Sequence, residues 1–237
     1  MKKSISVISL LLLLVFISTS NVYAKETYFI NDNGISFSKE EYDFLTQLFW
    51  DECQNLFTET DYNNFINSDI MNGELNIKTN DVIMPMATLH ETNAKIFKIA
   101  TSCNSDCFVS VTLTWKAYPN VRSYDVMGAY LEKTSLLNSP VTTVTNSSET
   151  YMQKFNNGFG VSLKLPTGNN NGIIVNQVFR VNKGGHIYAS YQHAKSSISL
   201  DNSKKYTLAR YGYGDVFKFS GPAVNIYDQM GGIDIGV

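Results

Sequence analysis

The spacing of hydrophobic residues changes part-way along the chain, from a helical period to a period of two. Between Val109 and Trp115, apolar residues alternate strictly with serine and threonine, which is typical of a half-buried antiparallel strand. Further strand-like runs span 125–131, 161–165, 173–181, 187–191, 205–208, 216–219 and 232–237. Turn-forming residues separate these runs at short intervals. The pattern predicts an antiparallel β-sandwich or barrel-like domain and argues against a parallel α/β sheet.

The N-terminal part carries the helical period. Residues 28–37 have the pattern of a β-hairpin around an Asn-Asp-Asn-Gly turn. Ser38 with Glu41, and Thr58 with Asp61, each match the capping box that begins a helix, and apolar residues follow both at helical spacing. We therefore expect two short helices joined as a helical hairpin.

The predicted fold is α+β and mainly β. Residues 72–92 show no clean period, so we expect a linker or irregular wrap there, with a boundary near residue 85. The expected organisation is a β-hairpin plus two-helix element over 25–85, followed by an antiparallel β-sandwich domain over 86–237.

The first 24 residues have the pattern of a secretory signal peptide. Lys2 and Lys3 precede an apolar run from Leu10 to Ile17, and a small-residue cleavage site ends at Ala24. We expect cleavage there and a secreted protein. After residue 24 no apolar stretch is long enough for a transmembrane segment. The signal and the Asn-, Lys-, Tyr- and Ile-rich composition suggest an exported protein of a Gram-positive bacterium.

Charge excludes one large class of partner. The whole chain has a formal net charge of −2, and losing Lys2 and Lys3 would make the mature part more acidic. No cluster of basic residues stands out, so nucleic acid is not an expected partner.

The cysteines predict one local disulfide. Cys103 and Cys107 flank a turn-forming Asn-Ser-Asp triplet between two strand-like runs, and an exported protein meets an oxidising environment. A metal or redox pair is the alternative, but the spacing suits neither and no second Cys or His pair lies nearby. Cys53 sits among apolar residues, and we expect it to be a small buried hydrophobic residue.

No catalytic motif is evident. The chain lacks Gly-x-Ser-x-Gly, His-Glu-x-x-His and a phosphate-binding loop. Its three histidines (His90, His186 and His193) do not have metal-ligand spacing, so we expect no metal and no cofactor. Asp125, Asp215, Asp228 and Asp234 lie near Gly or Tyr and are expected to stabilise turns. The sequence favours a non-enzymatic protein, with a hydrolase built from distant residues as an open alternative.

The strongest candidate for ligand binding is a set of aromatic residues. Tyr211 and Tyr213 alternate with glycines in one predicted loop, a format suited to stacking on sugar rings or peptides. Tyr118, close to Arg122, is a second candidate. His186 and Tyr188, with Ser190 and Gln192, would line one face of the strand at 186–192. The alternative is that these tyrosines close strand corners and that this face is polar and solvent-exposed.

We therefore expect a secreted binding protein whose extracellular partner is a cell-envelope glycan or a surface protein. A membrane-active, pore-forming toxin is the alternative, because 135–150 is rich in Ser, Thr and Val. That stretch is short for an inserting β-hairpin, and we expect a flexible loop between strands.

Overall fold

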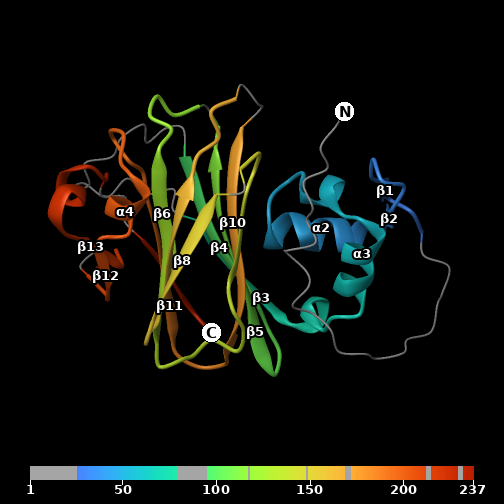
Figure 1. Cartoon of the computed structure of the whole chain (residues 1–237). Helices are drawn as coiled ribbons and strands as arrows, with labels where there is room; N and C mark the ends of the chain where they lie inside the picture. Colours follow the sequence, from blue (N-terminus) through green and yellow to red (C-terminus); the bar gives the residue numbers. More distant parts are fainter. Residues whose placement is uncertain are drawn as a thin grey trace.

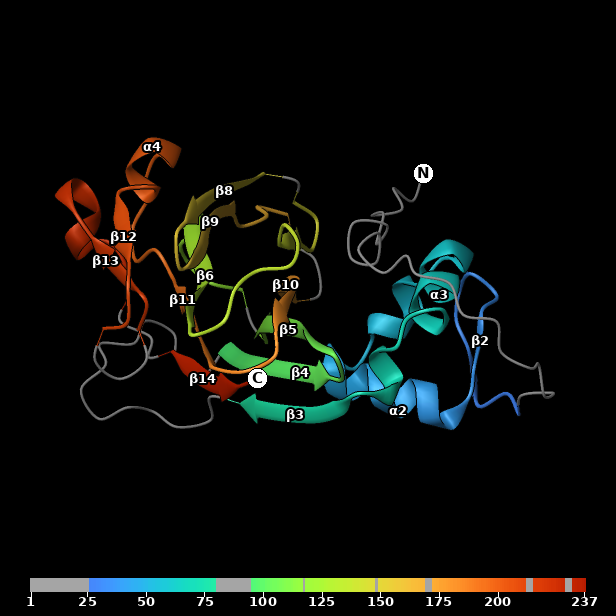
Figure 2. The same ribbon diagram turned by 90° about the horizontal axis from the view of Figure 1, so that it is seen from below.

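Two antiparallel sheets lie face to face at the centre of the molecule (Figures 1 and 2). The structure, a computed structural model, describes residues 26–79, 95–116, 118–147, 149–168, 172–211, 215–228 and 232–237. The first five-stranded sheet has the order β3 (Glu74–Thr79), β4 (Lys95–Cys103), β5 (Asp106–Trp115), β10 (Ile173–Asn182) and β7 (Val141–Val144). The second has the order β14 (Ile233–Gly236), β11 (His186–Gln192), β6 (Tyr124–Glu132), β9 (Gly158–Lys164) and β8 (Thr150–Phe155). The predicted α+β, mainly β fold is confirmed.

The main core lies between the two sheets. The apolar positions of β5 that alternate with Ser and Thr all point into it, because successive side chains of a strand face opposite sides of the sheet. Fully buried members of this core include Val109, Val111, Leu113, Trp115, Phe159 and Phe179. The alternation in the sequence thus identifies the inner face of the first sheet.

An N-terminal layer covers part of the outer face of the first sheet, on the right in Figure 1. It comprises β1 (Phe29–Ile30), β2 (Ser36–Phe37), α2 (Lys39–Leu48), η1 (Cys53–Leu56), α3 (Glu59–Ile66) and η2 (Ile70–Asn72). Both predicted capping boxes are present, at Ser38 for α2 and Thr58 for α3. Phe49, which follows α2, packs edge-on against Phe108 of β5 with ring centroids 6.0 Å apart.

A C-terminal layer covers the outer face of the second sheet. It comprises α4 (Leu200–Ser203), β12 (Tyr206–Leu208), β13 (Phe217–Phe219) and η5 (Gly221–Asn225). β12 and β13 pair only with each other, so two of the predicted strands form a small sheet outside the sandwich. The molecule therefore has four layers, and apolar clusters fill all three spaces between them.

Two segments depart from the sequence expectations. Residues 74–79, expected to be irregular, form edge strand β3, whose Leu75 and Ile77 pack toward the N-terminal layer. In the Ser/Thr-rich stretch 135–150, expected to be a loop, residues 141–144 form strand β7. Both strands gain backbone hydrogen bonds from a neighbour distant in sequence, which local periodicity does not reveal.

The cysteines behave as predicted. Cys103 and Cys107 are joined by a disulfide that closes the β4–β5 hairpin. Cys53 is buried and lies in η1. The expected signal peptide and the boundary near residue 85 lie outside the described residues. No helix in the described part of the chain has both the length and the apolar character needed to cross a membrane.

Candidate functional site

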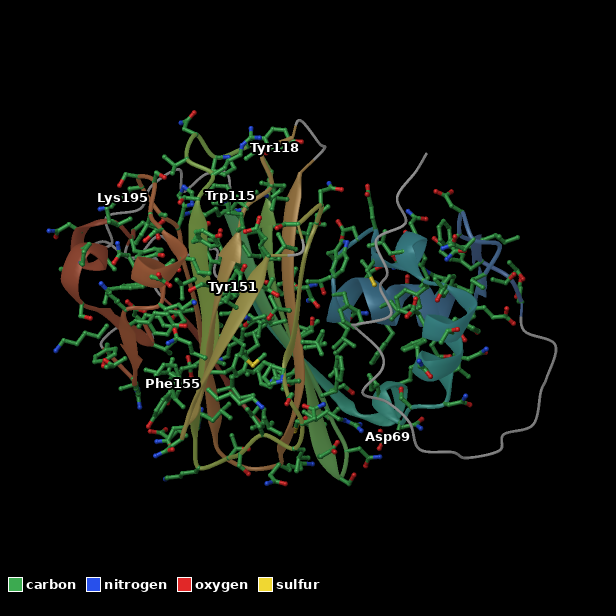
Figure 3. All side chains as sticks on the ribbon, viewed as in Figure 1. Asp69, Trp115, Tyr118, Tyr151, Phe155 and Lys195 are labelled. Atoms are coloured by element: carbon green, nitrogen blue, oxygen red, sulfur yellow. A yellow bond between two sulfur atoms is a disulfide. The ribbon has the colours of Figure 1, made fainter. Side chains whose placement is uncertain are left out.

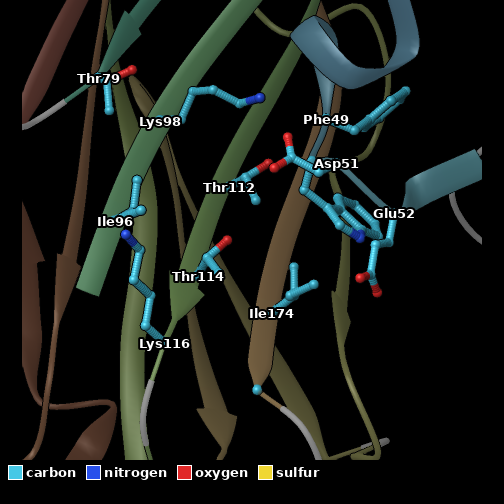
Figure 4. Close-up of a pocket in the computed structure, with 12 residues that line it drawn as sticks. Phe49, Asp51, Glu52, Thr79, Ile96, Lys98, Thr112, Thr114, Lys116 and Ile174 are labelled. Carbon is cyan, nitrogen blue, oxygen red and sulfur yellow. The ribbon is translucent and has the colours of Figure 1, made fainter. Parts of the chain in front are cut away.

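A groove of about 410 Å³ lies between the first sheet and the chain segment that follows α2 (Figure 4). One wall is the outer face of the sheet, with Thr79, Ile96, Lys98, Thr112, Thr114, Lys116, Gly172 and Ile174. The other wall is the segment from Phe49 to Glu52. A concave volume of this size is in the range of small-ligand sites in proteins.

The local sequence explains how the two walls come together. Helix α2 ends at Phe49, whose backbone N–H still donates to the Leu45 carbonyl while its φ of −113° and ψ of −103° turn the chain. Phe49 is buried against the sheet, so the next three residues lie over the groove. On the sheet, Thr112 and Thr114 occupy the positions of β5 that face away from the main core. Figure 4 shows these two threonines facing Asp51 and Glu52.

The cations of the groove have different surroundings. Lys98 donates to the backbone carbonyls of Thr46 (3.2 Å) and Gln47 (3.0 Å), at the C-terminal end of α2. Burial lowers the pKa of the Lys98 ammonium, and the nearby carboxylate of Asp51 opposes this shift. Lys116 is exposed at the end of β5. Lys98 is therefore held by the fold, whereas Lys116 is accessible to solvent.

Hydrogen-bonding groups line the floor of the groove. The Thr112 hydroxyl accepts from the Asn176 side-chain amide at 2.7 Å, which fixes its position. The same amide donates to the Ser110 hydroxyl at 2.9 Å. Thr114, one step further along β5, is partly buried and lines the groove directly. With Trp50, Ile96 and Ile174 the groove offers hydroxyls beside apolar surface, which suits a polar ligand with one apolar face.

A buried polar network lies at the same end of the sandwich, on the inner side of the first sheet. Asp125 accepts from the Tyr191 hydroxyl and from the backbone N–H of Ala194 (2.9 Å), and its Oδ2 lies 2.9 Å from Nδ1 of His193. The Trp115 indole donates to the Tyr191 hydroxyl at 3.0 Å. Burial, followed by the charge of Asp125, raises the pKa of Tyr191 well above its usual value.

A buried ion pair joins this network. Nζ of Lys95 lies 2.5 Å from Oδ2 of Asp228, and the two side chains are 1% and 0% exposed. Oδ1 of Asp228 accepts the backbone N–H of His193 at 2.8 Å. The expectation that Asp125 and Asp228 stabilise turns is therefore wrong, because both carboxylates hold buried partners from distant segments. Asp234 also differs from expectation, since it lies within strand β14.

The sequence-predicted binding residues do not form one surface. His186 and Tyr188 stack with ring centroids 6.1 Å apart, and the Arg210 guanidinium lies 4.6 Å from the Tyr188 ring centre. Tyr211 follows Arg210, and its hydroxyl is 3.1 Å from that of Thr207. Tyr213 lies outside the described residues. Three of the five candidates thus share one side of the molecule.

Tyr118 lies far from these candidates. It precedes β6, whereas His186 pairs with Glu132 at the other end of β6, so the two residues are at opposite ends of the sandwich. The Tyr118 ring supports the Arg122 guanidinium at 4.5 Å and packs on the main core. Most of the polar face of β11 is covered, because the C-terminal layer buries Tyr188, Ser190 and Gln192, whereas His186 is exposed.

The groove could not be predicted from the sequence. Its signal was present in two places: the polar positions Thr112, Thr114 and Lys116 that follow one face of β5, and the Trp-Asp-Glu triplet after a capped helix. Neither pattern shows that the two segments meet, because α2 and β5 are far apart in the sequence. Only the three-dimensional structure therefore reveals the groove.

Comparison with known proteins found no matching family model, no matching curated protein and no matching solved structure. Within the described ranges, no group of three or more His, Cys, Asp or Glu side chains is placed to hold a metal ion. The groove and its chemistry are therefore the main indication of function.

Proposed function

We propose that the chain is an exported, non-enzymatic binding protein that holds a cell-envelope glycan in the groove beside Trp50. The observation that carries the proposal is that Trp50 and the partly buried Thr114 line one concave site, with Thr112, which is 2% exposed, beneath them. Sugar rings present an apolar face that packs on an indole ring and hydroxyls that pair with fixed hydroxyl groups. Lys116 at the edge would favour glycans that carry an acidic group.

Export is supported by the sequence and by the covalent structure. The first 24 residues have the three-part pattern of a signal peptide. The Cys103–Cys107 disulfide suits an oxidising compartment. A glycan of the envelope is a partner that an exported protein meets there.

The groove favours a glycan over a surface protein as the ligand. A stable protein–protein interface buries roughly 800 Å² on each partner. The groove is instead a small concave volume of about 410 Å³, which a short segment of saccharide would fill.

The buried Asp125–His193 pair does not reach the groove, whose own carboxylates are those of Asp51 and Glu52. Asp125 and His193 are both 0% exposed and lie within the sandwich, so a ligand in the groove would not contact them. The membrane-active alternative has less support, because β7 and β8 belong to different sheets and do not form a hairpin that could insert.

The test is a binding assay with purified Gram-positive cell walls and with beads that carry N-acetylhexosamine oligosaccharides. We expect the wild-type protein to bind at least one of these materials. Trp50→Ala should weaken binding about tenfold, because it removes the stacking surface. Tyr151→Ala is the matched control, since Tyr151 is an exposed aromatic residue on β8 of the other sheet.

Two outcomes would contradict the proposal. The first is a wild-type protein that binds none of the glycans. The second is a Trp50→Ala variant that binds as well as the wild type, which would move the site elsewhere, with the His186, Tyr188 and Tyr211 side of the molecule as the next candidate.

A further inference from the structure

Lys95 and Asp228 form the most enclosed contact between a lysine and a carboxylate among the described residues. Their side chains are 1% and 0% exposed, and Nζ of Lys95 is 2.5 Å from Oδ2 of Asp228. The two residues are 133 positions apart in the sequence. Lys95 is the first residue of β4, and Asp228 lies in the segment that leads to β14, the last strand.

The surroundings exclude water and orient both groups. Trp115, the cross-strand neighbour of Lys95, places its ring centre 5.0 Å from Nζ. The backbone N–H of His193 donates to Oδ1 of Asp228 at 2.8 Å, and the Asp228 N–H returns a bond to the His193 carbonyl at 2.9 Å. Oδ1 is therefore held by a fixed donor while Oδ2 faces the amine.

We propose that Lys95 and Asp228 condense to an intramolecular isopeptide bond between Nζ and Cγ. A C=O bond is about 1.2 Å long, so Nζ lies at most about 3.7 Å from Cγ. This separation is close to that of a near-attack arrangement, in which reacting atoms are held about 3 to 3.5 Å apart. The proposal goes beyond the glycan-binding function and does not depend on it.

The reaction balances without any other reagent. The Lys95 ammonium first gives a proton to Oδ2, which leaves a neutral amine beside a neutral carboxyl group. The lone pair of Nζ then attacks Cγ, and the negative charge that develops on Oδ1 is stabilised by the N–H of His193. Nζ gives a second proton to Oδ2, the Cγ–Oδ2 bond breaks, and one water molecule leaves. The product is an amide.

Burial favours each step of this reaction. Desolvation raises the pKa of the Asp228 carboxyl group, although the nearby Lys95 opposes this shift, and the neutral acid is the form that the attack requires. Holding amine and acid in one cavity replaces a collision in solution by an intramolecular step with a very high effective concentration. Excluding water also protects the amide from hydrolysis.

Asp125 positions the oxyanion donor. Its two carboxylate oxygens contact His193 Nδ1 and the backbone N–H of Ala194, each at 2.9 Å. These contacts fix the backbone of His193, and with it the N–H that points at Oδ1 of Asp228. Asp125 is thus a positioning residue and does not itself touch the reacting atoms.

The consequence would be a covalent link between β4 and the segment that precedes the last strand, β14. Cys103–Cys107 closes only a short hairpin, with a separation of 4 residues. The isopeptide bond would close a loop of 133 positions and connect β4 of the first sheet to the segment that enters the second. Such a link limits how far an exported protein can unfold under force or protease attack.

The test is the intact mass of the purified protein, with its N-terminus determined in the same experiment and its disulfide reduced. We expect a mass lower than that calculated from the sequence by one water molecule. Protease digestion should yield one branched peptide that contains both Lys95 and Asp228. An unmodified mass would overturn the proposal, and so would a mass deficit located at any other pair.

Variants separate the bond from a simple ion pair. Lys95→Arg keeps the positive charge but replaces the nucleophilic amine, so it should fold and show the full calculated mass. Lys98→Arg is the matched control on the same strand and should keep the deficit. A deficit that persists in Lys95→Arg would overturn the assignment. If Lys95→Arg does not fold, the branched peptide of the wild type decides the question alone.

Discussion

Asp215 shows how strongly the C-terminal layer changes the environment of a single residue. Its Oδ1 accepts from the Gln192 side chain and from the backbone N–H of Phe217, each at 3.1 Å. Burial raises the pKa of this carboxyl group from 3.8 to about 6, although the hydrogen bonds oppose the shift. At the same pH, Asp215 is therefore protonated to a greater extent in the folded protein than in the unfolded chain.

This shift predicts a pH-dependent effect of Asp215→Asn. Between pH 3.8 and about 6 the folded state holds more protons than the unfolded state, so the contribution of Asp215 to stability falls as the pH rises through this window. Asparagine keeps the accepting oxygen and removes the charge. At pH 7 the variant should be more stable by up to about 3 kcal/mol. Urea denaturation between pH 4 and 7 measures this difference, and a gain of equal size at pH 4 would contradict the explanation.

Several residues could be assigned from the sequence because their roles are local. Ser38 and Thr58 cap helices within four residues of themselves, and Cys103 and Cys107 face each other across one turn. Asp125 and Asp228 could not be assigned in this way, since their partners come from segments distant in sequence. From sequence alone, a carboxylate near a glycine is assigned to a turn, and this assignment changes when the structure shows its long-range contacts.

At the scale of elements, the contact between β9 and β12 fixes the C-terminal layer on the sandwich. Gly160 of β9 lies directly under the ring of Tyr206, the first residue of β12. A Cβ atom at Gly160 would come within 2.5 Å of the Tyr206 hydroxyl oxygen and 2.8 Å of Cε2. Tyr206 is itself enclosed, with the Phe217 ring centre 5.0 Å from its own.

Gly160→Ala should therefore destabilise the protein. The added methyl group would displace a buried ring, and overpacking of this kind costs about 1 to 3 kcal/mol. The free energy of unfolding in urea measures the loss. Tyr206→Phe in the same background removes the atom in closest contact and should restore part of the stability. An alanine variant as stable as the wild type would show that the layer is not held at this contact.

The strands could be predicted from the alternation of apolar and polar residues, but the pairing of the strands could not. The alternation in β5 predicted which residues enter the main core, and the structure places Val109, Val111, Leu113 and Trp115 there. β3 has only two apolar residues, Leu75 and Ile77, in its alternation, and it pairs with β4 along its whole length. A short edge strand of this kind is determined by its neighbour more than by its own sequence.

At the scale of the whole molecule, the arrangement of layers determines where a ligand can bind. Figure 3 shows side chains filling the spaces on both sides of the sandwich. The N-terminal layer packs on Ala100, Phe108 and Val178 of the first sheet. The other half of that outer face, around Thr112 and Thr114, remains as the groove. Incomplete coverage of one sheet therefore creates the candidate site.

Layering also explains why the candidate site differs from the sequence prediction. The predicted polar row on β11 is an ordinary feature of a strand, and only the fold shows that the C-terminal layer covers all of it except His186. Its groups are satisfied within the protein: the Ser190 hydroxyl accepts from the Val216 N–H at 3.1 Å, and the Tyr188 hydroxyl donates to Glu132 at 3.1 Å. The sequence shows where hydrogen-bonding side chains occur, but long-range packing determines which of them are accessible to a ligand.

The proposed glycan site is tested most directly by the tryptophan fluorescence of the protein. The chain has two tryptophans, of which Trp50 lines the groove and Trp115 is fully buried in the main core. Titration with a soluble muramidase digest of Gram-positive cell walls should change the emission of the wild type in a saturable way. Trp50→Phe should show no change, because only Trp115 would then emit. An equal change in Trp50→Phe, or none in the wild type, would contradict binding in the groove.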